Sequence, residues 1–177
     1  MLKKAVLVGV LGGLFFGGAH SEAQPFKTSL QQNKGHPPQI VDCYAAQVIR
    51  PGDTWMIFLR AEDQDGDMES IAAVLWQAGV GYYPTDVTML KGEARKQSVG
   101  YLFLGTPPDS ALNWSEFELT ILVRDSQGNR SHPVKLPLRF DMAAKQEIPE
   151  KWQEAANHRL AALMINISLG VHRRGGR

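Results

Sequence analysis

The chain has little cysteine and almost no excess of charge of either sign. A single cysteine among 177 residues excludes an intramolecular disulfide and the thiolate clusters that hold structural zinc or iron-sulfur centres. Lysine and arginine number 19 against 18 aspartate and glutamate, whereas nucleic-acid-binding domains usually carry a clear excess of clustered basic residues. With 44% hydrophobic residues, the composition is that of one folded domain. We therefore expect a globular protein that does not bind nucleic acid.

Sequence signatures of catalysis are also missing. There is no Gly-x-Ser-x-Gly motif, no Ser-x-x-Lys motif and no glycine pattern for binding phosphate or a dinucleotide. The one thiol, Cys43, lies in a predicted strand, where a small core residue is expected rather than a nucleophile. We interpret the chain as a protein that is not an enzyme. A small envelope hydrolase remains an alternative, because catalytic triads assemble from residues far apart in sequence.

The N-terminal residues have the pattern of an export signal. Two lysines precede an uncharged apolar stretch over residues 5–18, and small residues occupy both positions that a signal peptidase would inspect before Gln24. The apolar stretch is shorter than the roughly 20 residues that a membrane-spanning helix needs. We predict a signal peptide over residues 1–23 and a flexible leader over residues 24–38. The mature protein is expected to be periplasmic or secreted, without a transmembrane segment.

The next hundred residues contain short apolar stretches separated by turn signals. Between Thr54 and Ala61 large apolar side chains recur at every second residue, which is the period of a strand with one buried side. Seven strands are predicted, over residues 40–46, 54–61, 71–77, 87–90, 99–104, 117–124 and 133–140. This number of strands in about 100 residues is typical of an immunoglobulin-like sandwich. We predict a mostly β fold with a single seven-stranded immunoglobulin-like β-sandwich over residues 39–141.

Two loops of this region resemble those of bacterial immunoglobulin-like and cadherin-like modules. In such modules an acidic D-x-D-G loop follows the second strand, and a D-x-x-G-N-x-S hairpin joins the last two. The chain has the first pattern over residues 63–66 and the second over residues 125–131. The resemblance covers residues 38–141 and implies the sandwich fold. It names no single function, because such modules serve adhesion, spacing, ligand binding and assembly alike.

The acidic loop is the best candidate for a binding site. Calcium takes about six to eight oxygen ligands, and alternate aspartates around a glycine turn several carboxylates toward one point. In the predicted topology the last hairpin lies at the same end, so Asp63, Asp65, Asp67 and Asp125 are the predicted calcium ligands. The loop is not an EF-hand, because its sixth and twelfth positions are not glycine and an acid. The alternatives are a solvated acidic turn and a zinc site that includes His132.

After Asp141 the period of the apolar residues becomes helical. Steps of three and four residues join Trp152, Ala155, Ala156, Leu160, Leu163, Met164 and Ile167. We predict one amphipathic α-helix over residues 142–170, followed by a basic tail over residues 171–177. The apolar side of this helix either packs on the sandwich of its own chain or binds a partner subunit or a membrane surface.

Three aromatic residues in connecting segments leave a further alternative. Tyr82, Tyr83 and Trp114 either complete the core or form a platform on which sugar rings stack. The sequence as a whole predicts an exported, non-catalytic immunoglobulin-like module that contacts an envelope or extracellular protein, with the C-terminal helix as the candidate partner element and calcium as an optional stabilising ion. The alternative function is that of a small carbohydrate-binding module.

Overall fold

The computed structural model describes residues 35–169. The predicted signal peptide, most of the leader and the basic tail lie outside these residues. The described part contains the following strands and 3-10 helices: β1 (Gln39–Ala45), β2 (Val48–Ile49), β3 (Thr54–Glu62), β4 (Met68–Gln77), β5 (Gly81–Tyr82), β6 (Asp86–Met89), η1 (Gly92–Arg95), β7 (Gln97–Gly105), η2 (Ser110–Trp114), β8 (Phe117–Asp125), β9 (Val134–Phe140), η3 (Glu150–Trp152), η4 (Ala155–Asn157) and β10 (Arg159–Ala162).

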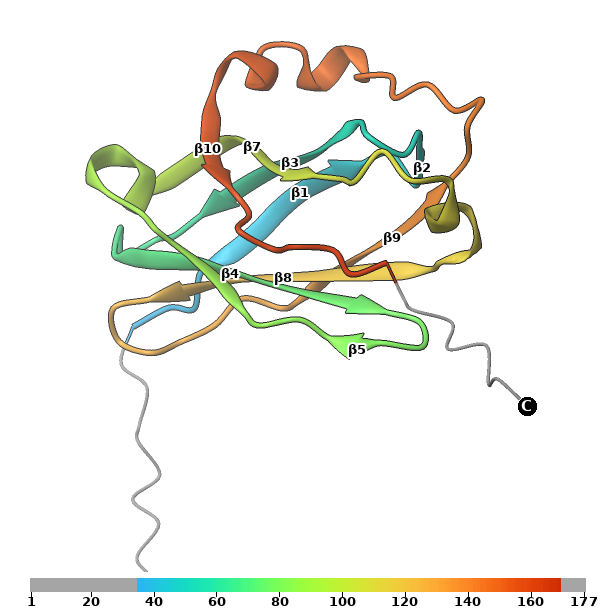
Figure 1. Ribbon diagram of the computed structural model, residues 1–177. Helices are drawn as coiled ribbons and strands as arrows, with labels where there is room; N and C mark the ends of the chain where they lie inside the picture. Colours follow the sequence, from blue (N-terminus) through green and yellow to red (C-terminus); the bar gives the residue numbers. More distant parts are fainter. Residues whose placement is uncertain (1–34, 170–177) are drawn as a thin grey trace, which may run out of the picture. The chain divides into compact units, whose positions relative to one another are not determined.

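The strands form two sheets that pack face to face (Figure 1). The four-stranded sheet has the order β1-β3-β7-β10, and the other has the order β2-β9-β8-β4-β5, with β6 also paired to β4. The predicted strands coincide with β1, β3, β4, β6, β7, β8 and β9. Of these, β1, β3 and β7 share one sheet, and β4, β8 and β9 share the other, as in an immunoglobulin-like sandwich. The fold class is therefore confirmed, with β2, β5 and β10 as additional short strands.

The core between the sheets is built by the period-two pattern of the long strands. Trp55, Ile57 and Leu59 of β3 are fully buried, and so are Leu119 and Ile121 of β8. Each such side chain contributes about 1.5–3 kcal/mol relative to an exposed position. Successive side chains of a strand point to opposite faces, so this register also fixes which residues of each sheet point outward.

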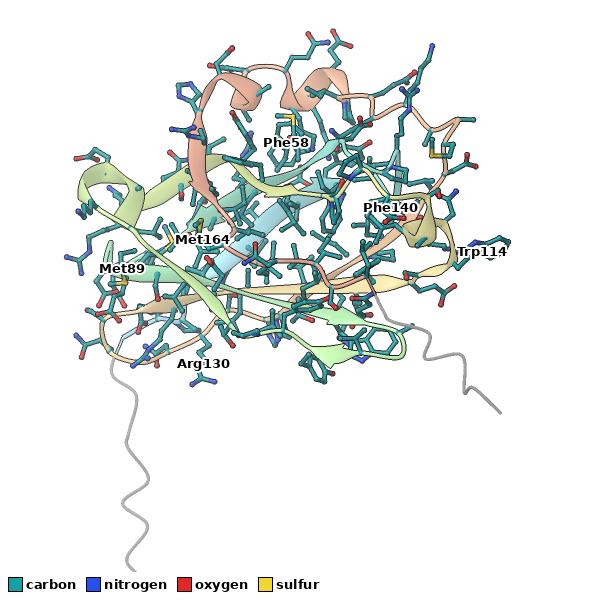
Figure 2. The ribbon with its side chains drawn as sticks, in the orientation of Figure 1. Phe58, Met89, Trp114, Arg130, Phe140 and Met164 are labelled. Atoms are coloured by element: carbon teal, nitrogen blue, oxygen red, sulfur yellow. The ribbon has the colours of Figure 1, made fainter. Side chains whose placement is uncertain are left out.

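The C-terminal helix predicted over residues 142–170 is present only as two short 3-10 turns, η3 and η4. Trp152 of η3 is 1% exposed and stacks on Phe58 of β3, with ring centroids 5.6 Å apart. Together with Ala155 they form a second apolar cluster on the outer side of the four-stranded sheet, beneath the segment that Figure 2 shows above Phe58. The residues of η3 and η4 therefore cover this sheet face, and the extent predicted for the helix is corrected.

The remainder of the predicted helix is extended. Strand β10 pairs in parallel with β7, and residues 159–169, hereafter the C-terminal strap, continue along the open side between the sheets. Leu163 and Ile165 are buried in the main core, whereas Met164 between them is 81% exposed. The backbone amide of Leu163 donates to the carbonyl of Phe103 at 2.8 Å. The strap thus has the two-residue period of a strand. The helical spacing predicted from the sequence arose because residues that pack in two different clusters were counted as one stripe.

Candidate functional site

The acidic loop joins β3 to β4 and is a tight turn held by its own first aspartate. The backbone carbonyl of Asp63 accepts a hydrogen bond from Gly66 N at 3.2 Å, and its Oδ1 accepts one from Asp65 N at 2.9 Å. Gly66 has a φ of 72°, a left-handed conformation that glycine adopts without strain. This geometry turns alternate carboxylates of the loop toward one another.

Three of the four predicted ligands come together. Asp63, Asp65 and Asp67 each offer a carboxylate oxygen, and these oxygens all lie within 4.8 Å of one another. Asp63 is only 4% exposed. Its Oδ2 atom and Oδ1 of Asp67 are buried without a hydrogen-bond partner among residues 35–169. Buried polar atoms are nearly always paired, so the lack of a partner at these two oxygens is unusual, and the three aspartates form a group that could bind a metal ion.

The electrostatics of Asp63 are those of a carboxyl group held among other carboxylates. Burial raises the pKa of Asp63 above its ordinary value, and the hydrogen bond from Asp65 N acts against this increase. Contacts with Asp67 and the charge of Asp125 raise the pKa further. A group in this position is destabilised as an anion unless a proton or a cation neutralises the site.

Asp125 lies beside this group but has a different role. It is paired in register with Met68 at the start of β4, so the last hairpin does lie against the acidic loop. The contact is made by Ser126, whose Oγ donates to Asp67 Oδ2 at 2.6 Å. The Asp125 carboxylate itself accepts hydrogen bonds within its own hairpin, from Gln127 N at 2.9 Å and from Asn129 N at 2.7 Å. Asp125 therefore orders the hairpin and adds negative charge, and its oxygens are not part of the group of three.

Sequence reasoning missed one residue at the site, His36 of the leader. Its backbone amide donates to Asp65 Oδ2 at 2.5 Å, and its Nδ1 lies 3.1 Å from Asp65 Oδ1. These contacts lower the pKa of Asp65. Beside them a polar groove of about 700 Å³ is lined in part by Asp63, Glu93 and Lys96. No sequence motif links a leader residue to a loop 29 positions away, so only the fold reveals this contact.

The remaining candidates are distributed over the sandwich. His132 is exposed and is not part of the acidic group. Tyr82 is exposed on β5, whereas the Tyr83 hydroxyl donates to the buried Gln77 and accepts from Ser168 N. Trp114 is 91% exposed in η2 (Figure 2). The two tyrosines therefore point in different directions, and only Tyr82 and Trp114 offer exposed rings.

A second candidate site is the outer face of the six-stranded sheet. Register pairs join Trp76 to Tyr82, and Ala72 to both Val87 and Leu122, so these side chains share one face. We define this outer face by its apolar residues, which are Ala72, Val74, Trp76, Tyr82, Val87, Met89 and Leu122. Tyr82 is 77% exposed and Val87 and Met89 are 54% and 56% exposed. No part of residues 35–169 covers this face, in contrast to the face covered by η3 and η4.

Comparisons with known proteins find similarity to solved structures at low sequence identity. No family model and no curated protein matches it. A PKD domain of an M14-like peptidase from Thermoplasmatales archaeon SCGC AB-540-F20 is similar over 60% of this chain and 98% of that chain, with 16% identity and a TM-score of 0.40. The SrpA adhesin from Streptococcus sanguinis is similar over 61% of this chain and 57% of that chain, with 18% identity and a TM-score of 0.40.

A third solved structure contains metal ions. It is the CARDB domain of the PF1109 protein from Pyrococcus furiosus in complex with di-metal ions, similar over 58% of this chain and 91% of that chain, with 10% identity and a TM-score of 0.34. The strand order described above itself defines this chain as an immunoglobulin-like sandwich. In the described range, no helix has the length and apolar character needed to cross a membrane.

Proposed function

We propose that this chain is an exported, non-catalytic immunoglobulin-like module that makes protein contacts in the cell envelope. The observation that carries the proposal is the uncovered outer face, where Tyr82, Val87 and Met89 expose apolar side chains at successive places along one edge of β4. Contiguous apolar surface of this kind is typical of interaction sites in soluble proteins. The contact surface is therefore a sheet face and not the C-terminal segment, because Trp152 and Leu163 of that segment pack on their own sandwich.

The absence of catalysis is supported by the environment of the one thiol. Burial raises the pKa of Cys43 to about 12, and the charge of Asp42 adds to this effect. A thiol in this state is not a nucleophile near neutral pH.

A site-specific crosslinking experiment in the native host tests the contact function. A photoreactive amino acid replaces Val87 on the outer face or, as the matched control, Val41 of β1, since the two valines are 54% and 53% exposed. We expect the Val87 variant to give protein adducts in the envelope fraction and the Val41 variant to give few. If neither position gives adducts, or if both give the same ones, the proposed contact surface is wrong. The processed chain recovered in this experiment should begin at Gln24.

For the acidic group we infer calcium as the ion. The three side chains offer only carboxylate oxygens, which suit a hard cation better than a transition metal. A divalent cation would pair the buried oxygens of Asp63 and Asp67 and would neutralise the charge that raises the pKa of Asp63. Its effect would be to fix the acidic loop against the Ser126 hairpin, so the ion would stabilise the module and would not take part in a reaction.

Calorimetric titration with calcium chloride tests this inference. We expect saturable binding that is lost in Asp67→Asn and retained in Asp109→Asn, a control that removes the same charge from the N-cap of η2. Magnesium should bind less tightly, because it demands octahedral geometry and keeps more of its water. If the unaltered chain gives no heat of binding with calcium, the loop is a self-capped acidic turn and not a calcium site.

A further inference from the structure

One end of the sandwich exposes apolar side chains on three separate segments. Trp114, the last residue of η2, is 91% exposed and points away from the sandwich in Figure 2. Val80, in the turn between β4 and β5, is 46% exposed, and Leu169, the last described residue, is 36% exposed. A tryptophan this exposed is unusual, because its large ring is mostly buried in folded proteins. We call Val80, Trp114 and Leu169 the tip.

Hydrogen bonds hold these three segments at the C-terminal end of β4. The backbone amide of Ala78 donates to the carbonyl of Glu116 at 2.9 Å, which joins the β4–β5 turn to the chain that follows η2. The side-chain amide of Gln77 donates to the carbonyl of Ser168 at 3.1 Å, which fixes the residue before Leu169. The tip is therefore a set of loops attached to one strand end.

The sequence that continues from the tip is basic. Residues 170–177 contain no acidic side chain, and they contain three arginines, Arg173, Arg174 and Arg177. A chain extends by at most about 3.6 Å per residue, so Arg173 and Arg174 lie within about 18 Å of Leu169 whatever path the chain takes. Cationic side chains thus accompany the exposed apolar ones.

The acidic residues near the tip do not cancel this charge. Glu118 Oε1 is paired with Lys135 Nζ at 2.8 Å. The register of β8 and β9 places Arg139 across from Glu116. Asp109 accepts a hydrogen bond from the backbone of η2, which it caps. The acidic group lies at the other end of the ten-residue strand β4, about 33 Å away, which is several times the Debye length of about 8 Å at physiological salt.

We propose that the tip binds the surface of an anionic phospholipid bilayer, with Trp114 among the headgroups and the three arginines on the lipid phosphates. Tryptophan favours this interface, because its ring is apolar while its N–H is polar. Each arginine near an anionic membrane surface raises the affinity about fivefold, so the two signals together give an attachment that neither gives alone. The inference goes beyond the contact function and uses different side chains.

The form of the tip favours a lipid layer over a protein as the occupant. Its three apolar side chains belong to separate loops with polar residues such as Glu116 between them. A specific protein interface needs about 800 Å² of complementary surface on each partner. A fluid layer of headgroups deforms around single side chains and needs no such continuous face.

Cosedimentation of the processed chain with vesicles tests the inference. At low ionic strength we expect binding to vesicles of equal parts phosphatidylcholine and phosphatidylglycerol, and none to phosphatidylcholine alone or in high salt. Trp114→Ala should weaken the binding at least tenfold, and replacement of the three tail arginines by glutamine about a hundredfold. Met164→Ala is the matched control and should bind like the parent, because Met164 is 81% exposed but lies far from Trp114 in Figure 2.

Vesicles with brominated acyl chains report whether the tip itself enters the bilayer. Bromine should quench the emission of Trp114, and this part of the quenching should be lost in Trp114→Phe. Trp55 and Trp152 are buried and should not respond. Thermal melts check that each variant is folded.

Two results overturn the inference. One is a parent chain that does not bind the mixed vesicles. The other is binding that Trp114→Ala leaves unchanged, because the arginines alone would then hold the chain. Crosslinking at Val87 reports separately on the outer face, so the contact function can stand when the tip fails, and the tip can bind lipid when the contact function fails.

Discussion

The carbonyl oxygen of His158 accepts a hydrogen bond from the backbone amide of Tyr101 at 2.9 Å and lies directly against Gly100 of β7. A Cβ atom added at Gly100 would overlap this oxygen and would crowd the side chain of Leu160. The absence of a side chain at one position of β7 is therefore what allows the C-terminal strap to approach the sheet.

Gly100→Ala is expected to displace the strap. The overlap is with backbone and cannot be relieved by a rotamer change, so the free energy of unfolding should fall by about 1–3 kcal/mol. Gly105→Ala in the same strand meets no atom within 4 Å and should change it by less than about 0.5 kcal/mol. Urea unfolding measures both, and limited proteolysis should cleave the strap only in Gly100→Ala. Equal stability of the two variants would show that the strap is not held at this point.

The stacking of Trp152 on Phe58 should dominate the attachment of η3. Trp152 is 1% exposed, so Trp152→Ala is expected to lower the free energy of unfolding by about 3–5 kcal/mol. Trp114 is 91% exposed, and Trp114→Ala should be within about 0.5 kcal/mol of the parent. Denaturant unfolding followed by circular dichroism compares the two. Similar losses for both substitutions would contradict the described packing.

Cys43 should be unreactive in the folded chain. Its pKa is raised from 9.0 to about 12, so the thiolate fraction near pH 8 should be roughly a thousandfold smaller than in the unfolded chain. A chromogenic disulfide reagent should therefore react slowly with the native protein and rapidly in denaturant. Fast reaction of the native protein would mean that the thiol is accessible and activated, and would reopen the question of catalysis.

Because the acidic group gathers like charges, Asp63→Asn and the parent chain should change their order of thermal stability between chelator and calcium. Asp63→Asn keeps an oxygen that accepts from Asp65 N but removes a buried negative charge, so in chelator this variant should melt above the parent. In calcium at a hundredfold excess over the dissociation constant, the parent should gain about 2.7 kcal/mol and melt above the variant. Scanning calorimetry in the two buffers gives the comparison. A variant that is less stable than the parent in both would mean that the Asp63 charge is already compensated within the chain.

Strands β3 and β8 were predictable because their apolar side chains recur at every second residue, as Trp55, Ile57 and Leu59 of β3 do. The C-terminal segment was not, because two periods overlap there. Trp152 and Ala155 lie three residues apart and pack on the outside of one sheet, whereas Leu163 and Ile165 lie two apart and pack between the sheets. Local spacing alone does not reveal that neighbouring residues serve different clusters.

The candidate site was predictable where it depended on local sequence. Asp63, Asp65 and Asp67 come together because a glycine turn brings alternate residues of one short loop to one side. Asp125 is also an aspartate at the same end of the sandwich, but its carboxylate accepts hydrogen bonds from backbone amides of its own hairpin. His36 could not be inferred, since its contact with Asp65 depends on how the leader enters the first strand.

Oxidation of methionine by dilute peroxide tests the contact surface most directly. Met89 on the outer face and Met142, which follows β9, are 56% and 55% exposed, so the two should be oxidised at similar rates in the isolated, diluted chain. In intact envelopes Met89 should become protected while Met142 continues to react, measured as the ratio of the two sulfoxides by mass spectrometry. A ratio that is the same in the envelope and in the isolated chain would contradict the claim that the outer face is where this protein makes its contacts.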